Sequence, residues 1–316
     1  MLSREHTAFR CAATILPRIP FARYALSLPP DVALFSRGIH AIKRRVPDTA
    51  ISLDSLYKSF PPVQSGWRAF LQPFSASSLP ALRNVNMQIR QGEAVALLGT
   101  NGAGKTTLLR ILATLLLPTS GSAVIAGHDA VRDPRAARRQ IGYHAGSDLG
   151  FYARLTGREN LRFFGRLNHL SDTYLRGHIA QLAERFELQS ALDRQVRTLS
   201  AGTVQRLSLL RAILHEPTVL LLDEPTRSLD AIAAADFRKF LKTEVLKKQG
   251  TSLLFASHTL PEIDNLADRV AILNEGQLIA FDTPSNLKSR AGAGTLEHAF
   301  CQLTGHSADA LEEPVS

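Results

Sequence analysis

Cysteine is scarce in this sequence, and its distribution excludes disulfide-rich and zinc-dependent folds. The 316 residues include two cysteines, Cys11 and Cys301, near opposite ends of the chain. There is no Cys-x-x-Cys pair and no grouping of cysteine with histidine. We therefore expect neither a disulfide framework nor a structural zinc site, and we predict that the chain works in a reducing compartment.

Long apolar runs are also missing. A membrane-spanning helix needs roughly 18 to 20 consecutive apolar residues. The longest candidate, residues 108–117, is interrupted by Arg110 and is better explained as part of a packed helix. We therefore expect a chain that is soluble or peripheral to a membrane.

Composition nevertheless indicates a folded protein, because 45% of the residues are apolar and the length suffices for one large domain or two modest ones. The net charge is +9, but residues 1–50 contain eight Arg and Lys against three Asp and Glu. That segment accounts for more than half of the net positive charge. The remainder is only mildly basic, so no nucleic-acid partner is expected.

Residues 1–50 form a basic N-terminal extension by composition. Prolines at 17, 20, 29 and 30 interrupt its mixture of basic and apolar residues. No apolar stretch is long enough for a secretory signal. Three interpretations stay open: a poorly ordered extension, including an over-long start site; a basic amphipathic segment at 32–45 on an anionic membrane surface; and a mitochondrial transit peptide.

Residues 99–107, GTNGAGKTT, match the Walker A pattern of a phosphate-binding loop. The apolar run 94–98 before it predicts a buried strand, and Leu and Ile residues after it recur at helical spacing. A glycine turn between a strand and a helix N-terminus aims free N–H groups and a partial positive charge at an anion. The predicted nucleotide-binding residues of this loop are Gly99, Asn101, Gly102, Gly104, Lys105, Thr106 and Thr107.

Four side chains are predicted to carry the chemistry of that nucleotide. Lys105 is expected to pair with its β and γ phosphates, and the Thr106 hydroxyl to bind Mg²⁺. Far along the chain, the apolar strand predicted at 218–226 delivers Asp223 and Glu224, which point to opposite sides of an extended chain. Asp223 is predicted to be the carboxylate that acts on Mg²⁺. Glu224 is predicted to orient the water that attacks the γ phosphate.

A second anion-binding element is predicted at residues 199–207, LSAGTVQRL, just before the apolar helical run 207–214. Ser200 and Gly202 stand at a helix start, where a hydroxyl and free backbone N–H groups point one way. Taken alone, this is an ordinary helix cap.

Periodicity predicts the remaining elements in outline. Alternating or apolar runs predict strands at 51–60, 81–90, 122–127 and 141–143, a short helix within 132–139, and a helical insert at about 155–192. The aromatic residues between 63 and 80 indicate either a small satellite core or a partner contact, with the core favoured.

Five motifs then occur in a characteristic order: GTNGAGKTT, LSAGTVQRL, LLLDEPT, SLD at 228–230 and ASH at 256–258. Over residues 51–284 the chain resembles the ATP-binding subunit of an ABC transporter. The resemblance implies an α/β fold with a RecA-like P-loop NTPase core, an antiparallel β subdomain and an inserted α-helical subdomain. It also implies two such domains, head to tail, with two ATP molecules between them.

The resemblance divides the chain into the extension 1–50, an ATP-binding domain at 51–285 with its helical subdomain at about 145–206, and a tail at 286–316. It also adds roles residue by residue. Phe60 matches the aromatic side chain on which adenine stacks. Ser200 and Gly202 match the signature that closes on the γ phosphate bound by the opposite subunit. Asp230 matches the loop that crosses the dimer interface, and His258 matches the histidine that contacts the γ phosphate.

The chain departs from the family pattern at two places. The signature has Ala201 where the family usually has Gly, and Thr203 where it usually has Gln. The family's loop Gln, which senses Mg²⁺ and the attacking water, falls at Gly146 or Ser147, with Asp148 the nearest side chain that could replace it. ATP hydrolysis is still expected, because the catalytic set keeps all its members: Lys105, Asp223, Glu224 and His258.

The C-terminal motifs around 269–284 and 295–305 resemble single-domain ATPases of two-component exporters. This implies a polytopic transmembrane channel subunit as partner, a homodimer of ATP-binding domains, and a peripheral place on the cytoplasmic face of the inner membrane. A mitochondrial place is the alternative if residues 1–50 are a transit peptide. The rival functions are a non-transport ABC-type ATPase and an ATP-binding regulatory module.

Overall fold

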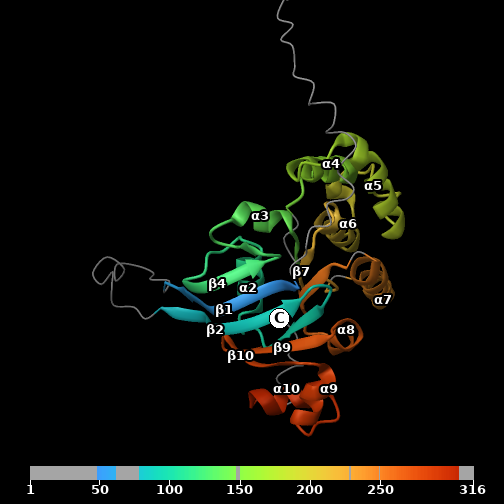
Figure 1. Cartoon of the computed structure of the whole chain (residues 1–316). Coiled ribbons are helices and arrows are strands. Elements are labelled where there is room, and N and C mark those ends of the chain that lie inside the picture. Colours follow the sequence, from blue (N-terminus) through green and yellow to red (C-terminus); the bar gives the residue numbers. More distant parts are fainter. Residues whose placement is uncertain (1–47, 62–77, 147–149, 228, 249, 306–316) are drawn as a thin grey trace, which may run out of the picture. The chain divides into compact units, whose positions relative to one another are not determined.

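The computed structural model describes residues 48–61, 78–146, 150–227, 229–248 and 250–305 (Figure 1). The chain divides into two compact units, Met1–Arg45 and Val46–Ser316, and every described residue belongs to the second. The predictions for the basic extension up to residue 47, and for the aromatic stretch 63–77, lie outside the described residues. Within the described ranges, no helix is long and apolar enough to cross a membrane.

A six-stranded sheet is built from the apolar runs in the middle and second half of the chain. Its strand order is β10-β9-β3-β8-β7-β6, with β9, β3, β8, β7 and β6 parallel and β10 antiparallel to β9. Strands β3, β7 and β8 are almost wholly buried, which explains why they appear in the sequence as continuous apolar runs rather than alternating ones. The strands are β3 Ala94–Leu98, β6 Ile141–Ala145, β7 Val219–Asp223, β8 Ser252–Ala256, β9 Arg269–Asn274 and β10 Gln277–Asp282.

A separate antiparallel sheet has the order β2-β1-β4-β5. Its members are β1 Thr49–Phe60, β2 Leu79–Arg90, β4 Ser120–Ile125 and the short β5 His128–Asp129. In β2, buried residues alternate with exposed ones from Val85 to Arg90, as the sequence pattern predicted. The predicted strands at 51–60, 81–90, 122–127 and 141–143 are thus confirmed, with ends shifted by two residues or fewer.

Strand β3 separates two hydrophobic cores because its side chains alternate between the faces of the parallel sheet. Val95 and Leu97 belong to the core shared with α2 and the antiparallel sheet, whereas Ala94, Ala96 and Leu98 belong to the core on the other face. The helices beside the sheet are α2 Lys105–Leu112, α3 Pro134–Arg139, α7 Ala231–Phe240 with its π-helical continuation η3 Leu241–Lys248, α8 Leu260–Leu266, α9 Pro284–Arg290 and α10 Leu296–Thr304.

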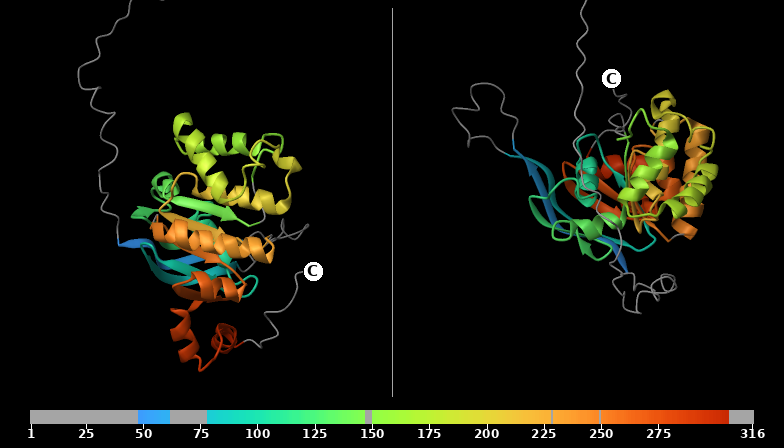
Figure 2. Two further views of the ribbon diagram at one scale, coloured as in Figure 1. Left: turned by 90° about the vertical axis from the view of Figure 1, so that its right-hand side faces the viewer. Right: turned by 90° about the horizontal axis from the view of Figure 1, so that it is seen from above.

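The helical insert forms an arm beside the sheet edge at β6, while α9 and α10 lie beyond the opposite edge (Figures 1 and 2). The arm comprises α4 Gly157–Leu167, α5 Asp172–Arg185, the short 3-10 turn η2 Val196–Thr198 and α6 Ala201–Ile213. The predicted helical insert, with one helix opening at 156–161 and another containing 180–186, corresponds to α4 and α5, although helix does not extend to residue 192. A turn at 168–171 separates α4 from α5, with His169 in the left-handed region at φ 62°, and the chain leaves helix after Arg185.

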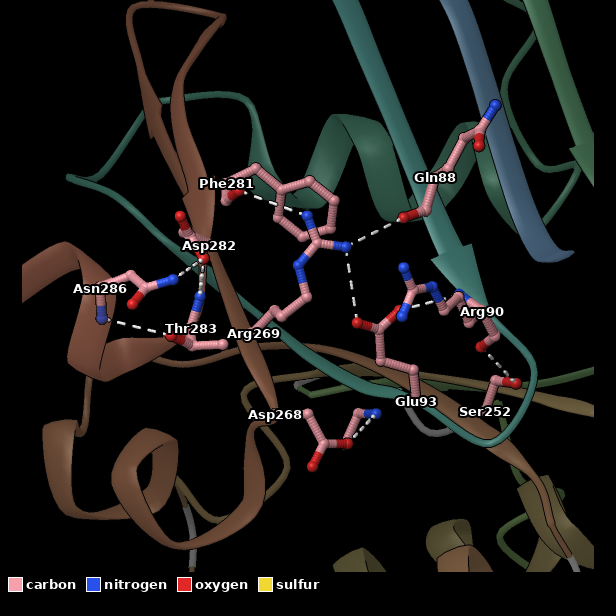
Figure 3. Close-up of polar contacts among 11 residues, drawn as sticks. Gln88, Arg90, Glu93, Ser252, Asp268, Arg269, Phe281, Asp282, Thr283 and Asn286 are labelled. Carbon is pink, nitrogen blue, oxygen red and sulfur yellow. Dashed lines mark hydrogen bonds and ion pairs between the residues drawn. The ribbon is translucent and has the colours of Figure 1, made fainter.

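One arginine joins the two sheets (Figure 3). The guanidinium of Arg269 on β9 lies 3.5 Å above the ring of Phe281 on β10. Its Nη1 donates to the Gln88 carbonyl on β2 and to Glu93 Oε1 before β3, each at 3.5 Å, and its Nη2 donates to the Phe281 carbonyl at 3.3 Å. The planar group therefore ties the antiparallel sheet to the parallel one.

A buried hydrogen-bond chain links the arm to the parallel sheet. His144 on β6 has no exposed surface, and its Nδ1 lies 3.0 Å from Ser208 Oγ on α6. Gln205 Nε2, also on α6, donates to the Pro225 carbonyl at 2.9 Å and lies 3.4 Å from His144 Nε2. Because an amide nitrogen only donates, these contacts require an unprotonated Nε2 and a proton on Nδ1. Burial, with a smaller effect of Arg211, lowers the pKa of His144 to about 4.

This depressed pKa predicts an acid-sensitive arm. The unfolded chain takes up a proton near the ordinary pKa of 6.5, whereas folded His144 resists until about 4, so stability is lost as the pH falls between these values. We expect wild type to lose about 2 kcal/mol more unfolding free energy than His144→Gln between about pH 7.5 and pH 5, measured by urea denaturation.

The variant His144→Leu separates titration from hydrogen bonding. It removes the same pH dependence but leaves one N–H of the Gln205 amide without its acceptor, while the bond to the Pro225 carbonyl remains, so it should be less stable than His144→Gln at every pH. Equal losses in wild type and His144→Gln would contradict the assignment.

Candidate active site

The segments that carry the predicted site residues meet at one edge of the parallel sheet. Strand β8 lies between β3 and β7, with Leu97 paired to Ala256 and Ala256 paired to Asp223. The phosphate-binding loop follows β3, Glu224 follows β7, and His258 follows β8. In parallel sheets, ligands bind outside the carboxyl ends of the strands, at such a junction of neighbouring loops.

In the phosphate-binding loop, the turn formed by residues 99–104 before α2 depends on glycine. Gly102 and Gly104 have φ 82° and 103°, in the region that L side chains rarely adopt. A Cβ on Gly104 would also come within 2.6 Å of the Ala81 carbonyl. Gly104 is the N-cap residue of α2, so the free N–H groups of that helix begin where the loop ends. Asn101 and Thr106 are exposed and Thr107 is half-buried, so these side chains border the loop.

Lys105 fills the inside of this loop. Its Nζ donates to the Gly99 carbonyl at 2.6 Å and to the Thr100 carbonyl at 2.9 Å, and the residue is only 9% exposed. Burial lowers the pKa of Lys105, while the nearby carboxylates of Glu224 and Asp223 act in the opposite direction. The buried amine and the free N–H groups of α2 make the loop suited to an anion with several charged oxygens.

Asp223 and Thr106 form the oxygen-donor pair beside the loop. Burial raises the pKa of Asp223, and neighbouring Glu224 adds to the rise. A hydrogen bond from the Thr106 side chain and the charge of Lys105 act in the opposite direction. A hydroxyl and a carboxylate already in contact supply the hard oxygen ligands that Mg²⁺ prefers. A partly buried carboxylate of this kind also gains from a cation, so the residues present fit the ion.

Glu224 is the first residue after β7 and contacts side chains from the neighbouring segments. Its φ of 48° places it in the left-handed region, and its N–H donates to the Ala256 carbonyl at 3.0 Å. Its Oε1 lies 3.4 Å from Nδ1 of His258, and its Oε2 accepts from Arg227 Nη1 at 3.3 Å. The histidine side chain is 62% exposed and that of Glu224 22% exposed, so an open side of this carboxylate faces solvent.

The remaining predicted residues belong to β1, α6 and α7. Phe60 ends β1 with 38% of its surface exposed, and Lys58 Nζ lies 5.0 Å from its ring centroid. Ser200 caps α6 by accepting from Thr203 N–H at 3.3 Å, and Gly202 lies in the same first turn. Asp230 caps α7 by accepting from Ala233 N–H at 2.8 Å. Within the described ranges, the side chains of Ser200 and Asp230 make only these local hydrogen bonds and one between the Ser200 and Thr203 hydroxyls.

Gly146 lies against the end of β7. Its N–H donates to the Asp223 carbonyl at 3.1 Å, and a Cβ at this position would come within 2.7 Å of the same carbonyl oxygen. The backbone here leaves no room for a side chain such as Gln. Ser147 and Asp148 lie outside the described residues, so their predicted part in this loop stays a prediction.

Sequence reasoning missed two residues that contact the catalytic segments. Arg227, which the sequence motifs do not single out, reaches the Glu224 carboxylate. Glu262, which also belongs to none of the sequence motifs, is 1% exposed and hydrogen-bonded to Ser257 and Thr226. Apart from the spacing of four residues between His258 and Glu262, no local signal could have indicated these contacts.

The chain is similar to known transport ATPases along most of its length. The family model for the ABC transporter matches residues 82–227. The chain is 39% identical over 199 residues to the ABC transporter ATP-binding protein NatA of Bacillus subtilis, covering 63% of this chain and 80% of the relative. It is 36% identical over 250 residues to the daunorubicin resistance ATP-binding protein DrrA3 of Streptomyces coeruleorubidus, covering 79% and 73%.

Solved structures agree with this fold. A structure described as an ATP binding subunit of an ABC transporter has 26% identity and a TM-score of 0.69, covering 81% of this chain and 99% of that one. The post-hydrolysis dimer of the ATP-binding cassette MJ0796, bound to ADP and Pi, has 24% identity and a TM-score of 0.64, covering 74% and 98%. The predicted RecA-like α/β class, with its antiparallel and helical parts, is confirmed. The chain belongs to the ABC transporter family and is the subunit of such a transporter that binds and hydrolyses ATP to power transport.

Proposed function

We propose that this ATPase works as a head-to-tail dimer that drives export through a separate polytopic membrane subunit. The observation that carries the proposal is the convergence of Lys105, Asp223, Glu224 and His258 at the ends of three neighbouring strands. Such a group suits hydrolysis of a bound nucleotide phosphate, because it combines an anion-binding loop with a carboxylate open to water.

In the proposed reaction, the loop at 99–107 holds the β and γ phosphates, with Lys105 as the buried positive charge. Thr106 and Asp223 would hold Mg²⁺, which when bound neutralises phosphate charge. Glu224 orients the attacking water and takes up its proton, and His258, 3.4 Å from that carboxylate, contacts the γ phosphate. Phe60, exposed at the end of β1, stacks on adenine.

The proposed dimer is supported by three residues whose described side-chain contacts do not account for a role within one chain. Ser200, Gly202 and Asp230 stand at the N-terminal ends of α6 and α7, where free N–H groups favour an anion. Their described hydrogen bonds are local, and none reaches the phosphate-binding loop of their own chain. A second copy placed head to tail would bring Ser200 and Gly202 to the γ phosphate of its partner.

The proposed contact surface for the membrane subunit is the segment that leads into the helical arm. Tyr152 and Leu155 are 52% and 36% exposed, and Tyr152 packs edge-to-face on the half-exposed Phe163 at 5.1 Å. Exposed aromatic side chains of this kind suit a protein interface. The same segment begins at Gly146, whose N–H reaches the Asp223 carbonyl, so a contact here has a direct route to the site. This would place the subunit peripherally on the cytoplasmic face of the inner membrane; the mitochondrial alternative for residues 1–50 stays open.

Glu224→Gln tests the chemistry. An amide cannot take up the proton of water, so kcat for ATP hydrolysis should fall at least about 100-fold while ATP binding is retained. Steady-state phosphate release and nucleotide binding measure the two quantities. Glu297→Gln on α10 is the matched control and should keep wild-type turnover. ATP binding without any turnover in wild type would favour a regulatory module.

Co-purification tests the partner. Tagged Glu224→Gln, extracted in mild detergent with ATP, should hold its closed dimer and recover a polytopic membrane protein that mass spectrometry can identify. Lys105→Ala, with weakened phosphate binding, should recover less. Recovery of ribosomes or nucleic acid in place of a membrane protein would instead support a non-transport ATPase.

Gly146→Ala tests the close contact with Asp223. The added methyl group would push the Asp223 carbonyl, so we expect a loss of about 1 to 3 kcal/mol in unfolding free energy and a kcat lower by about 10-fold. Gly177→Ala is the control, because Gly177 is exposed on α5 with no atom within 4 Å of an added Cβ. That variant should be as stable as wild type or slightly more so. Wild-type behaviour of Gly146→Ala would refute the contact.

A further inference from the structure

Glu262 is a buried carboxyl group next to the catalytic segments. It lies in the first turn of α8 and is 1% exposed. Its Oε2 accepts from Ser257 Oγ at 2.5 Å and from Thr226 Oγ1 at 3.3 Å. Its Oε1 has no hydrogen-bond partner within the described part of the chain. A carboxyl group so deeply buried is costly unless its contacts serve the structure or the chemistry.

The two hydroxyl groups bound by Glu262 belong to two different catalytic segments. Thr226 comes two residues after Glu224 in the segment that follows β7, and Ser257 comes directly before His258 in the segment that follows β8. One carboxyl oxygen therefore joins both segments. The side chains that these segments carry, Glu224 and His258, approach each other to 3.4 Å.

The contacts around this oxygen have defined directions. The Ser257 hydroxyl accepts from the Thr259 N–H at 3.0 Å, which leaves its own proton free to be donated to Glu262. The Glu262 N–H donates to the Thr259 carbonyl at 3.0 Å, so the backbone between Ser257 and Glu262 forms a closed turn. His258 lies inside this turn. Its position is therefore coupled to the Glu262 side chain.

The side chains of Glu224, His258 and Glu262 also share one cavity. A cavity of about 370 Å³ is lined by Glu224, His258 and Glu262, with Arg227 and Arg238 among the other lining residues. Burial raises the pKa of Glu262, against the opposing effects of the Ser257 and Thr226 hydrogen bonds, Arg238 and His258. A protonated carboxyl group keeps lone pairs that accept both hydroxyls, so the bridge does not require a buried negative charge.

We propose that Glu262 is a positioning residue for ATP hydrolysis, which fixes the separation of His258 and Glu224 by binding Ser257 and Thr226 through one oxygen. The proposal rests on the catalytic roles proposed above for Glu224 and His258. Nucleotide affinity comes mainly from the phosphate-binding loop, which Glu262 does not contact. Loss of the bridge should therefore lower kcat and leave the KM for ATP nearly unchanged.

Two substitutions at Glu262 in the full-length chain test the bridge. Glu262→Leu keeps much of the side-chain volume but removes the acceptor, and should lower kcat at least about 10-fold with less than about a two-fold change in KM. Glu262→Gln keeps a carbonyl oxygen that accepts both hydroxyls, so kcat should stay within about three-fold of wild type. An unchanged kcat in Glu262→Leu, or an equal loss in both variants, would overturn the proposal.

A double-mutant cycle with His258→Ala tests the route of the effect. If Glu262 acts through His258, adding Glu262→Leu to His258→Ala should lower kcat by less than about three-fold more. Fully multiplicative losses would overturn this route. An unchanged kcat in His258→Ala alone would refute the catalytic role of the histidine, which is a different failure from an inert Glu262→Leu.

Hydroxyl deletions test the same bridge if Glu262→Leu does not fold. Ser257→Ala and Thr226→Val each remove one donor to Glu262, and each should lower kcat with little change in KM. Thr251→Val is the matched control: Thr251 is 2% exposed just before β8, and its hydroxyl donates to the Pro217 carbonyl, remote from the site. That variant should change thermal stability but not kcat. Wild-type kcat in both Ser257→Ala and Thr226→Val would overturn the proposal.

Discussion

Parallel pairing of β8 with both β3 and β7 is the constraint on which this site depends. Because the three strands run in one direction, the segments that follow them leave the sheet at a common edge. Lys105, Glu224 and His258, far apart in the sequence, are thereby brought together at this edge. The buried apolar side chains of these strands hold that edge in place, so the core determines the site geometry.

Buried and half-buried polar groups refine this arrangement, and each connects parts that the strands alone leave independent. Gln205 connects α6 to the Pro225 carbonyl and is itself supported by His144. Arg269 connects the two sheets. Such groups are costly to bury unless they are hydrogen-bonded, and each accordingly has a partner from another element. The energetic consequence is that small rotations of the arm or sheets disturb hydrogen bonds as well as packing.

The sequence predicted what is local and missed what is long-range. Walker A, the carboxylates after β7 and the cap at Ser200 are short patterns whose chemistry follows from neighbouring residues, and the apolar runs identified the strands. Two helices were predicted in the insert, but the turn between them at His169 was not located, because the residues around it still favour helix. Contacts such as Glu262 with Thr226, 36 residues apart, depend on which strands become neighbours, and no periodicity contains that information. Likewise, only the folded backbone reveals that Gly146 faces the Asp223 carbonyl.

The way in which the loop holds the Lys105 amine has a consequence for the thermodynamics of nucleotide binding. Two of the three N–H donors of this amine are already used by carbonyls of the loop, which leaves the third for a phosphate oxygen. These two hydrogen bonds hold the amine against the backbone of the loop, so a phosphate that binds there does not have to order this side chain. Phosphate binding by the amine should therefore cost little side-chain entropy and show a small change in heat capacity, unlike binding coupled to folding. Larger heat-capacity changes in this subunit would then report surface buried elsewhere, when two copies close on each other.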